Sequence, residues 1–174
     1  MENRTRKLVL IAILLSLSIV VNIVERFALQ GLTGMPWVRL GLANIIVLLV
    51  LYAYGLKDGF AIMLLRILLV AILTTGLGSV NFFLSLSGGI LSFVMMVIFK
   101  YIPGFSLVSV SVMGALGHST GQILMAMFLL ATDEIIFTLP VLMVISVPTG
   151  VFVGLVTQRV LSMVGPTMNI TSVE

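Results

Sequence analysis

Six apolar segments separated by short polar breaks take up nearly all of the 174 residues, so little chain remains for a soluble domain. Hydrophobic residues make up 60% of the sequence and charged residues only 9%. A typical soluble domain carries about 25% charged residues. A globule of this size cannot bury so many apolar side chains, and lipid must cover the remainder. The sequence therefore predicts an integral membrane protein in contact with the lipid bilayer.

The segments predict an all-α fold, a single membrane domain over residues 1–174 built as a bundle of six transmembrane helices. A bilayer core of about 30 Å requires about 20 helical residues. Membrane strands are not expected, because the segments lack the alternation of apolar and polar residues that a barrel requires. We expect turns at Lys57-Asp58-Gly59 and at Pro103-Gly104. The helices are expected at about residues 8–28, 40–56, 60–75, 82–99, 105–132 and 135–161.

The basic residues predict the orientation. With a cytoplasmic N-terminus, six basic residues fall on the cytoplasmic side and two on the outer side, as the positive-inside rule requires. Both termini of this multi-pass protein are then cytoplasmic. The pI of about 9.7 reflects this orientation, so no nucleic-acid partner is expected. The inner residues are Arg4, Arg6, Lys7, Lys57, Lys100 and Arg159, and the outer ones are Arg26 and Arg39.

Several kinds of chemistry lack the residues that they need. The chain has no cysteine, which excludes disulfides, thiolate metal sites and iron–sulfur clusters. Its single histidine argues against a haem or zinc site held by the protein alone. There is no P-loop, and Asp133-Glu134 stands alone where a diphosphate-binding enzyme would need several acids for magnesium. We therefore expect no metal, no cofactor and no catalytic residue, and the protein is not expected to be an enzyme.

Two helix faces carry small and polar residues at similar depth. On the fifth segment Ser111, Gly114, His118, Gly121, Gln122 and Met125 fall within about 100° of one another. The fourth segment has a comparable stripe that includes Ser92. These faces either border a ligand cavity that opens outward or form close helix contacts with interhelical hydrogen bonds. The candidate ligand contacts from these faces and the second segment are His118, Gln122, Asn44, Asn81 and Ser85.

Arg66 is a charged residue inside the third segment, where charge is unfavourable without a partner or a function. It either binds an anionic group of the ligand, pairs with another helix, or extends its stem toward the headgroups. It is included among the candidate ligand contacts. Glu25 shares a face of the first segment with Ser18 and Asn22. It is either an acid of the cavity or an exposed residue at a helix end.

The longest outer connection, residues 29–39, holds the only tryptophan. Trp37 and Arg39 are therefore candidates for a lid over the cavity. The alternative for Trp37 is an anchor at the membrane interface.

Two pairs of small residues suggest helix contacts with other subunits. Ala12 and Ser16 lie one turn apart on the first segment, about 120° from the face of Ser18 and Glu25. Gly150 and Gly154 form a GxxxG pair on the sixth segment, after Pro148. Such pairs let helices approach closely.

Three stretches carry a resemblance to a known family: LGLANIIVLLVLYAYGLKDGFAIMLLRILLV (40–70), FFLSLSGGILSFVMM (82–96) and SVSVMGALGHSTGQILMA (109–126). They resemble the Gx transporter family, whose members are often labelled heptaprenyl diphosphate synthase component I. That family is similar to the substrate-binding S components of energy-coupling factor (ECF) transporters. The resemblance implies a bacterial plasma-membrane protein with a ligand site toward the outside.

The resemblance also implies partners: a transmembrane coupling subunit and two cytoplasmic ATPases. S components typically meet the coupling subunit through a small-xxx-small pattern on the first helix, which Ala12 and Ser16 match loosely. The expected function is therefore a substrate-binding subunit of an ECF-type uptake transporter. The alternatives are a membrane subunit of a flavin- or quinone-linked extracellular electron-transfer system and a non-catalytic partner in prenyl diphosphate synthesis. A vitamin, flavin, quinone or isoprenoid-like molecule is the expected ligand class.

Overall fold

A computed structural model describes residues 2–33 and 41–164, and within these ranges the protein is all-helical. The order of the helices follows the order of the expected segments. They are α1 (Glu2–Thr33), α2 (Asn44–Ala53), α3 (Leu56–Thr74), α4 (Val80–Lys100), α5 (Leu107–Leu130), the 3₁₀ helix η1 (Asp133–Thr138) and α6 (Leu139–Val164).

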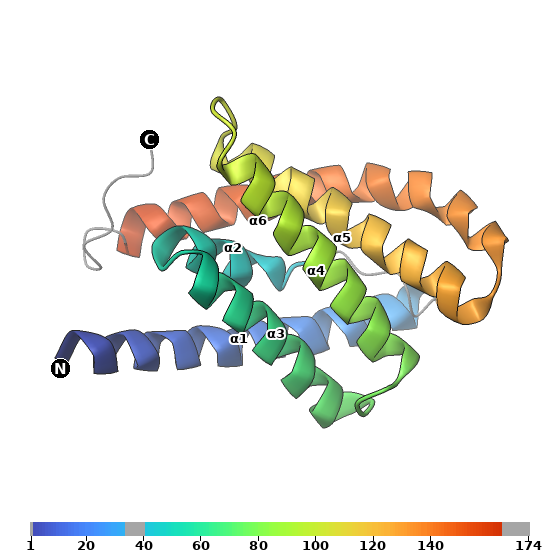
Figure 1. The fold of residues 1–174 in the computed structure, drawn as a ribbon, viewed down its shortest axis with the longest axis horizontal. Coiled ribbons are helices and arrows are strands. Elements are labelled where there is room, and N and C mark those ends of the chain that lie inside the picture. The colour runs from blue at the N-terminus through green and yellow to red at the C-terminus, as the bar shows by residue number, and fades with distance from the viewer. Residues whose placement is uncertain (1, 34–40, 165–174) are drawn as a thin grey trace.

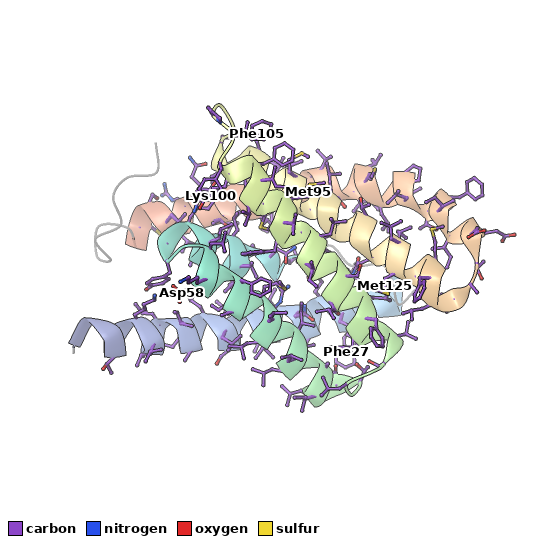
Figure 2. All side chains as sticks on the ribbon, in the orientation of Figure 1. Phe27, Asp58, Met95, Lys100, Phe105 and Met125 are labelled. Carbon is purple, nitrogen blue, oxygen red and sulfur yellow. The ribbon has the colours of Figure 1, made fainter. Side chains whose placement is uncertain are left out.

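The helices form a bundle in which the beginning of α1 and the end of α6 lie at the same end (Figure 1). The α2–α3 and α4–α5 turns lie at this end too, whereas the α3–α4 turn and η1 lie at the opposite end. Helix α5 packs against both α4 and α6, and α1 contacts α2 and α3. Figure 2 shows Asp58 and Lys100 toward the end where α1 begins, and Phe27 and Met125 away from it.

Four stretches of helix are long and apolar enough to cross a membrane, which indicates a membrane protein. Helix α3 is nearly as long but carries three charged residues, Lys57, Asp58 and Arg66. The six crossings expected from the sequence are thus not confirmed by length and composition. The four stretches are Lys7–Leu29, Val80–Lys100, Leu107–Leu130 and Asp133–Met163.

Helix α2 differs most from its expected span over residues 40–56. It has only 10 residues, which rise about 15 Å, half of the bilayer core. Every residue from Ile46 to Leu51 is buried, and these side chains form the centre of the main hydrophobic core. The helix is thus shorter than the expected span, and an uninterrupted apolar run does not show in the sequence whether protein or lipid surrounds it.

The turn expected at Lys57-Asp58-Gly59 is also displaced. The chain breaks at Gly55, whose φ of +95° is a left-handed conformation that glycine adopts without strain. Lys57 and Asp58 belong to the first turn of α3, where an acidic side chain interacts favourably with the helix dipole. The turn at Pro103-Gly104 is found as expected between α4 and α5.

Opposite charges hold the two ends of the buried helix α2. The Glu25 carboxylate accepts the backbone N–H groups of Gly41 at 2.6 Å and Leu42 at 2.8 Å, just before the helix begins. At the other end the Lys100 ammonium donates to the carbonyl of Leu51 at 2.8 Å. Backbone groups at helix ends lack partners inside the helix, and both charges have the sign that the helix dipole favours.

Helices α4, α5 and α6 approach one another so closely that glycine is required at the contacts. A Cβ atom on Gly121 of α5 would lie 2.7 Å from the Ser87 carbonyl oxygen of α4. On α6, Cβ atoms on Gly150 and Gly154 would each lie 2.7 Å from a Cα atom of α5. The GxxxG pair is therefore used inside this chain, which corrects its interpretation as a contact with another subunit.

Candidate functional site

A small polar cavity lies where the beginning of α2 meets α1, α3, α4 and α5. Its volume is about 20 Å³, enough for one water-sized group. Apolar or small residues complete its wall: Gly41, Ala43, Ile67 and Val70. Its polar residues are Asn22 and Glu25 of α1, Asn44 of α2, Arg66 of α3, Ser85 of α4 and His118 of α5. We call it the Arg66 cavity.

Four of the candidate ligand contacts from the sequence meet in this cavity: Asn44, Arg66, Ser85 and His118. They come from four different helices, so only the tertiary fold brings them together. Such a convergence of polar groups from several helices is the usual form of a ligand site inside a helix bundle.

Arg66 is held inside the bundle by a polar chain that crosses three helices. Its Nη2 donates to Asn44 Oδ1 at 3.2 Å, and Asn44 Nδ2 donates to Ser92 Oγ at 3.2 Å. Only 2% of Arg66 is exposed, so its side chain does not extend toward the headgroups. It pairs with another helix, one of the three interpretations that the sequence left open.

The guanidinium of Arg66 uses few of its five N–H donors. Neither Nε nor Nη1 has a hydrogen-bond partner among the described residues. Within residues 2–33 and 41–164, one ion pair is found, between Lys7 and Asp58 at 2.7 Å. No carboxylate of the described residues is thus in direct contact with Arg66, although Glu25 lines the same cavity, and the guanidinium keeps unused donors.

Glu25 is a cavity acid and not an exposed helix end, which decides between the two readings of the sequence. It is 8% exposed and lines the Arg66 cavity beside Asn22. Both of its oxygens accept backbone N–H groups at the start of α2. Its charge is therefore compensated by the beginning of that helix, as is usual for a carboxylate at a helix N-terminus.

His118 reaches the cavity from the middle of α5 and is 5% exposed. Its ring lies against the beginning of α2, because a Cβ atom on Gly41 would lie 3.3 Å from His118 Cδ2. Gln122 follows one turn later but does not line the cavity. It is fully buried, and its amide nitrogen and oxygen have no partner among the described residues. That His118 and Gln122 bind a ligand together remains a prediction.

Asn81 lies one turn before Ser85 on α4 and is not part of the cavity wall. The Ser85 hydroxyl donates to the Asn81 carbonyl at 2.7 Å, which links the two residues through the backbone. Trp37 and Arg39, the expected lid residues, lie outside the described residues.

Ala12 and Ser16, the expected partner-facing residues, are exposed on α1. The Ser16 hydroxyl donates to the Ala12 carbonyl at 3.0 Å, so it is satisfied within its own helix. Large apolar side chains of the same helix are exposed as well, among them Ile13, Leu17 and Val20. This face of α1 is covered by no other part of the described chain.

The sequence interpretation missed Asn22 and Gly41 as cavity residues. A signal for the first was present, because Ser18, Asn22 and Glu25 recur at helical spacing on an otherwise apolar helix. Ser18 is fully buried, and its hydroxyl donates to the Ala43 carbonyl at 3.5 Å. The polar face of α1 is therefore turned toward the start of α2, and its apolar face is turned outward.

Residues 2–33 and 41–164 contain no group of three or more His, Asp or Glu side chains placed to hold a metal ion. Asp133 and Glu134 begin η1 and are both exposed.

Comparison with known proteins gives one family. The sequence model of the family described as heptaprenyl diphosphate synthase component I matches residues 14–160, which include the Arg66 cavity and helices α2 to α5 entirely. No curated protein and no solved structure matches the chain. The chain belongs to the heptaprenyl diphosphate synthase component I family.

Proposed function

We propose that this chain is the membrane-embedded substrate-binding subunit of an uptake transporter of the energy-coupling factor type. The observation that carries the proposal is the Arg66 cavity, a buried polar site inside an apolar helix bundle. Buried polar and charged groups at membrane depth are costly and are usually retained for a ligand or an ion. The ligand is a small molecule of the vitamin, flavin, quinone or isoprenoid-like kind.

The proposal includes six crossings of the bacterial plasma membrane with both termini in the cytoplasm. Lys7 and Lys100 contact residues at one end of the bundle, Asp58 and Leu51, which supports a common basic side. The chain has no cysteine, so single cysteines report their own accessibility. Cysteines at Thr5 and Ser172 should resist an impermeant thiol reagent in intact cells, and one at Thr33 should react. Labelling of either terminal position would contradict this orientation.

We propose the exposed face of α1 around Ala12 and Ser16 as the contact with the transmembrane coupling subunit, which in turn binds two cytoplasmic ATPases. Replacing both residues with leucine should block close helix approach and reduce co-purification of the coupling subunit. Ala61→Leu is the matched control, because Ala61 is an exposed small residue on α3. Equal co-purification of the double variant and the control would remove this face from the proposal.

The family description favours a second candidate, a non-catalytic partner in prenyl diphosphate synthesis. Mass spectrometry of the molecule that co-purifies from native membranes separates the candidates. A molecule held by wild type and released by His118→Ala supports the binding subunit. A co-purifying prenyltransferase with no bound small molecule would support the second candidate, and a permanently bound flavin or quinone would indicate an electron-transfer subunit. In the first two candidates the chain itself is not an enzyme.

A further inference from the structure

The charge balance of the Arg66 cavity suggests what kind of group it receives. Arg66 and Glu25 both line it, but they are compensated to different extents. Each oxygen of Glu25 accepts a backbone N–H group, at 2.6 and 2.8 Å. Arg66 donates to Asn44 through Nη2 only, and its Nε and Nη1 have no acceptor within the described residues. The N–H donors that remain unused in the cavity therefore include those at Nε and Nη1 of Arg66.

A neutral molecule in the cavity would leave the charge of Arg66 without a directly bound anion. Glu25 acts on the charge of Arg66 across the cavity but forms no direct ion pair with it, and water accepts hydrogen bonds from a guanidinium without adding negative charge. A carboxylate or phosphate oxygen supplies both the acceptor and the negative charge. The cavity of about 20 Å³ has room for one such oxygen.

We infer that the ligand carries an anionic oxygen group, a carboxylate or a phosphate, that accepts a hydrogen bond in this cavity from an unused N–H group of Arg66, at Nε or at Nη1. The inference rests on the proposed function, because it names the chemistry of the ligand of the same site. Asn44 positions the guanidinium through Nη2 and is itself fixed by Ser92.

The same anion has two sources, a water-soluble molecule or an anionic lipid headgroup, and the experiment separates them. The full chain is placed in nanodiscs of phosphatidylcholine, and its melting temperature is measured against inorganic phosphate and formate at constant ionic strength with chloride. Wild type should show a saturable rise with at least one anion. A second set of nanodiscs contains phosphatidylglycerol and no added anion.

The variants are Arg66→Met, Arg66→Lys and Arg26→Met. Arg26 is the matched control, since it is a second buried arginine but donates to Thr74 Oγ1 at 2.6 Å. The anion should still raise the melting temperature of the Arg26→Met variant but not that of the Arg66→Met variant. If Arg66→Met does not fold, Arg66→Lys decides, because a single ammonium should shift the half-maximal anion concentration at least tenfold.

Three results would overturn the inference: no saturable rise in wild type, an equal rise in both Arg66 variants, or a rise only with phosphatidylglycerol. The last would assign the site to a lipid headgroup. Identification of a neutral co-purifying ligand would overturn the inference but leave the transporter proposal intact. Conversely, anion binding at Arg66 without any coupling complex would contradict the proposed function and retain the anion site.

Discussion

Helix α1 and the group of helices α4, α5 and α6 are joined to the bundle in different ways. In the group, contacts are so close that Gly121 and Gly154 leave no room for a Cβ atom. The apolar span of α1 is only 11% buried, against 50% for α5. Polar side chains attach α1 to the other helices, among them Lys7 to Asp58, Glu25 to the start of α2, and Arg26 to Thr74. Ile11 and Leu14 of α1 also pack against the main hydrophobic core.

This difference indicates which wall of the cavity is fixed and which is adjustable. Among the cavity residues, Ser85 and His118 belong to the closely packed helices α4 and α5, whereas Asn22 and Glu25 belong to α1. The present volume of about 20 Å³ admits one water-sized group. A whole ligand requires a larger cavity, and we expect the wall on α1 to move when it binds, because the apolar span of α1 is only 11% buried.

The largest expected effect is at Glu25, which has the most important polar contact of α1. Glu25→Ala removes two charge-assisted hydrogen bonds to backbone N–H groups. At about 1.5–3 kcal/mol for each, the free energy of unfolding should fall by about 4 kcal/mol. Unfolding in mixed micelles measures this loss. Glu134→Ala, at an exposed acid of η1, is the control and should change stability by less than about 0.5 kcal/mol. Equal effects would remove the special role of Glu25.

A smaller loss is expected in the closely packed group. Gly121→Ala places a Cβ atom 2.7 Å from the Ser87 carbonyl oxygen and 3.0 Å from the Gly88 Cα atom, and both are backbone atoms. Overpacking of this kind should lower the free energy of unfolding by about 2 kcal/mol. Gly31→Ala is the matched control, since nothing lies within 4 Å of that position on α1. A tolerated Gly121→Ala would show that α4 and α5 separate easily.

The hydrogen bond between Arg26 and Thr74 should make a measurable contribution of its own. Arg26→Met and Thr74→Val, with their double variant, isolate the contact, for which we expect a coupling energy of about 1 kcal/mol. The net value is modest because desolvation of the guanidinium opposes the gain. A coupling energy near zero would show that the hydrogen bond between Arg26 and Thr74 does not help to hold α1 against α3.

The smallest effect is expected on the exposed face of α1. Replacing Ala12 and Ser16 together with leucine should change the free energy of unfolding by less than about 0.5 kcal/mol, since both side chains are exposed. Thermal unfolding of the isolated chain measures this change. A large loss would mean that this face contacts the chain itself and is not available to a partner.

Helix positions could be predicted from the sequence, and four of its eight candidate contacts line the Arg66 cavity. Apolar runs and polar breaks located each helix, and small-polar stripes on α4 and α5 identified Ser85 and His118. The limited length of α2 was missed, because hydropathy does not distinguish a helix buried in protein from one in lipid. The role of Glu25 was not decided because its partners are backbone N–H groups of Gly41 and Leu42, which leave no side-chain pattern.

The packing of Gly150 and Gly154 shows a related limit. A GxxxG pair indicates that another helix packs closely against it, but the sequence does not show which helix this is. Here it is α5 of the same chain, at Val108 and Val112. Ala12 and Ser16 form a similar pair that no described helix covers, and only the structure separates the two cases.

The most direct test of the account measures whether α1 moves independently of the closely packed helices. Because the chain has no cysteine, spin labels can be attached at Ser16 of α1, Val94 of α4 and Leu155 of α6, all exposed. Pulsed electron–electron distance measurements in nanodiscs compare the pair Ser16–Val94 with the pair Val94–Leu155. The account predicts a broader distance distribution for the α1 pair, which narrows when a ligand fills the cavity. Equally narrow distributions for both pairs, unchanged by ligand, would contradict it.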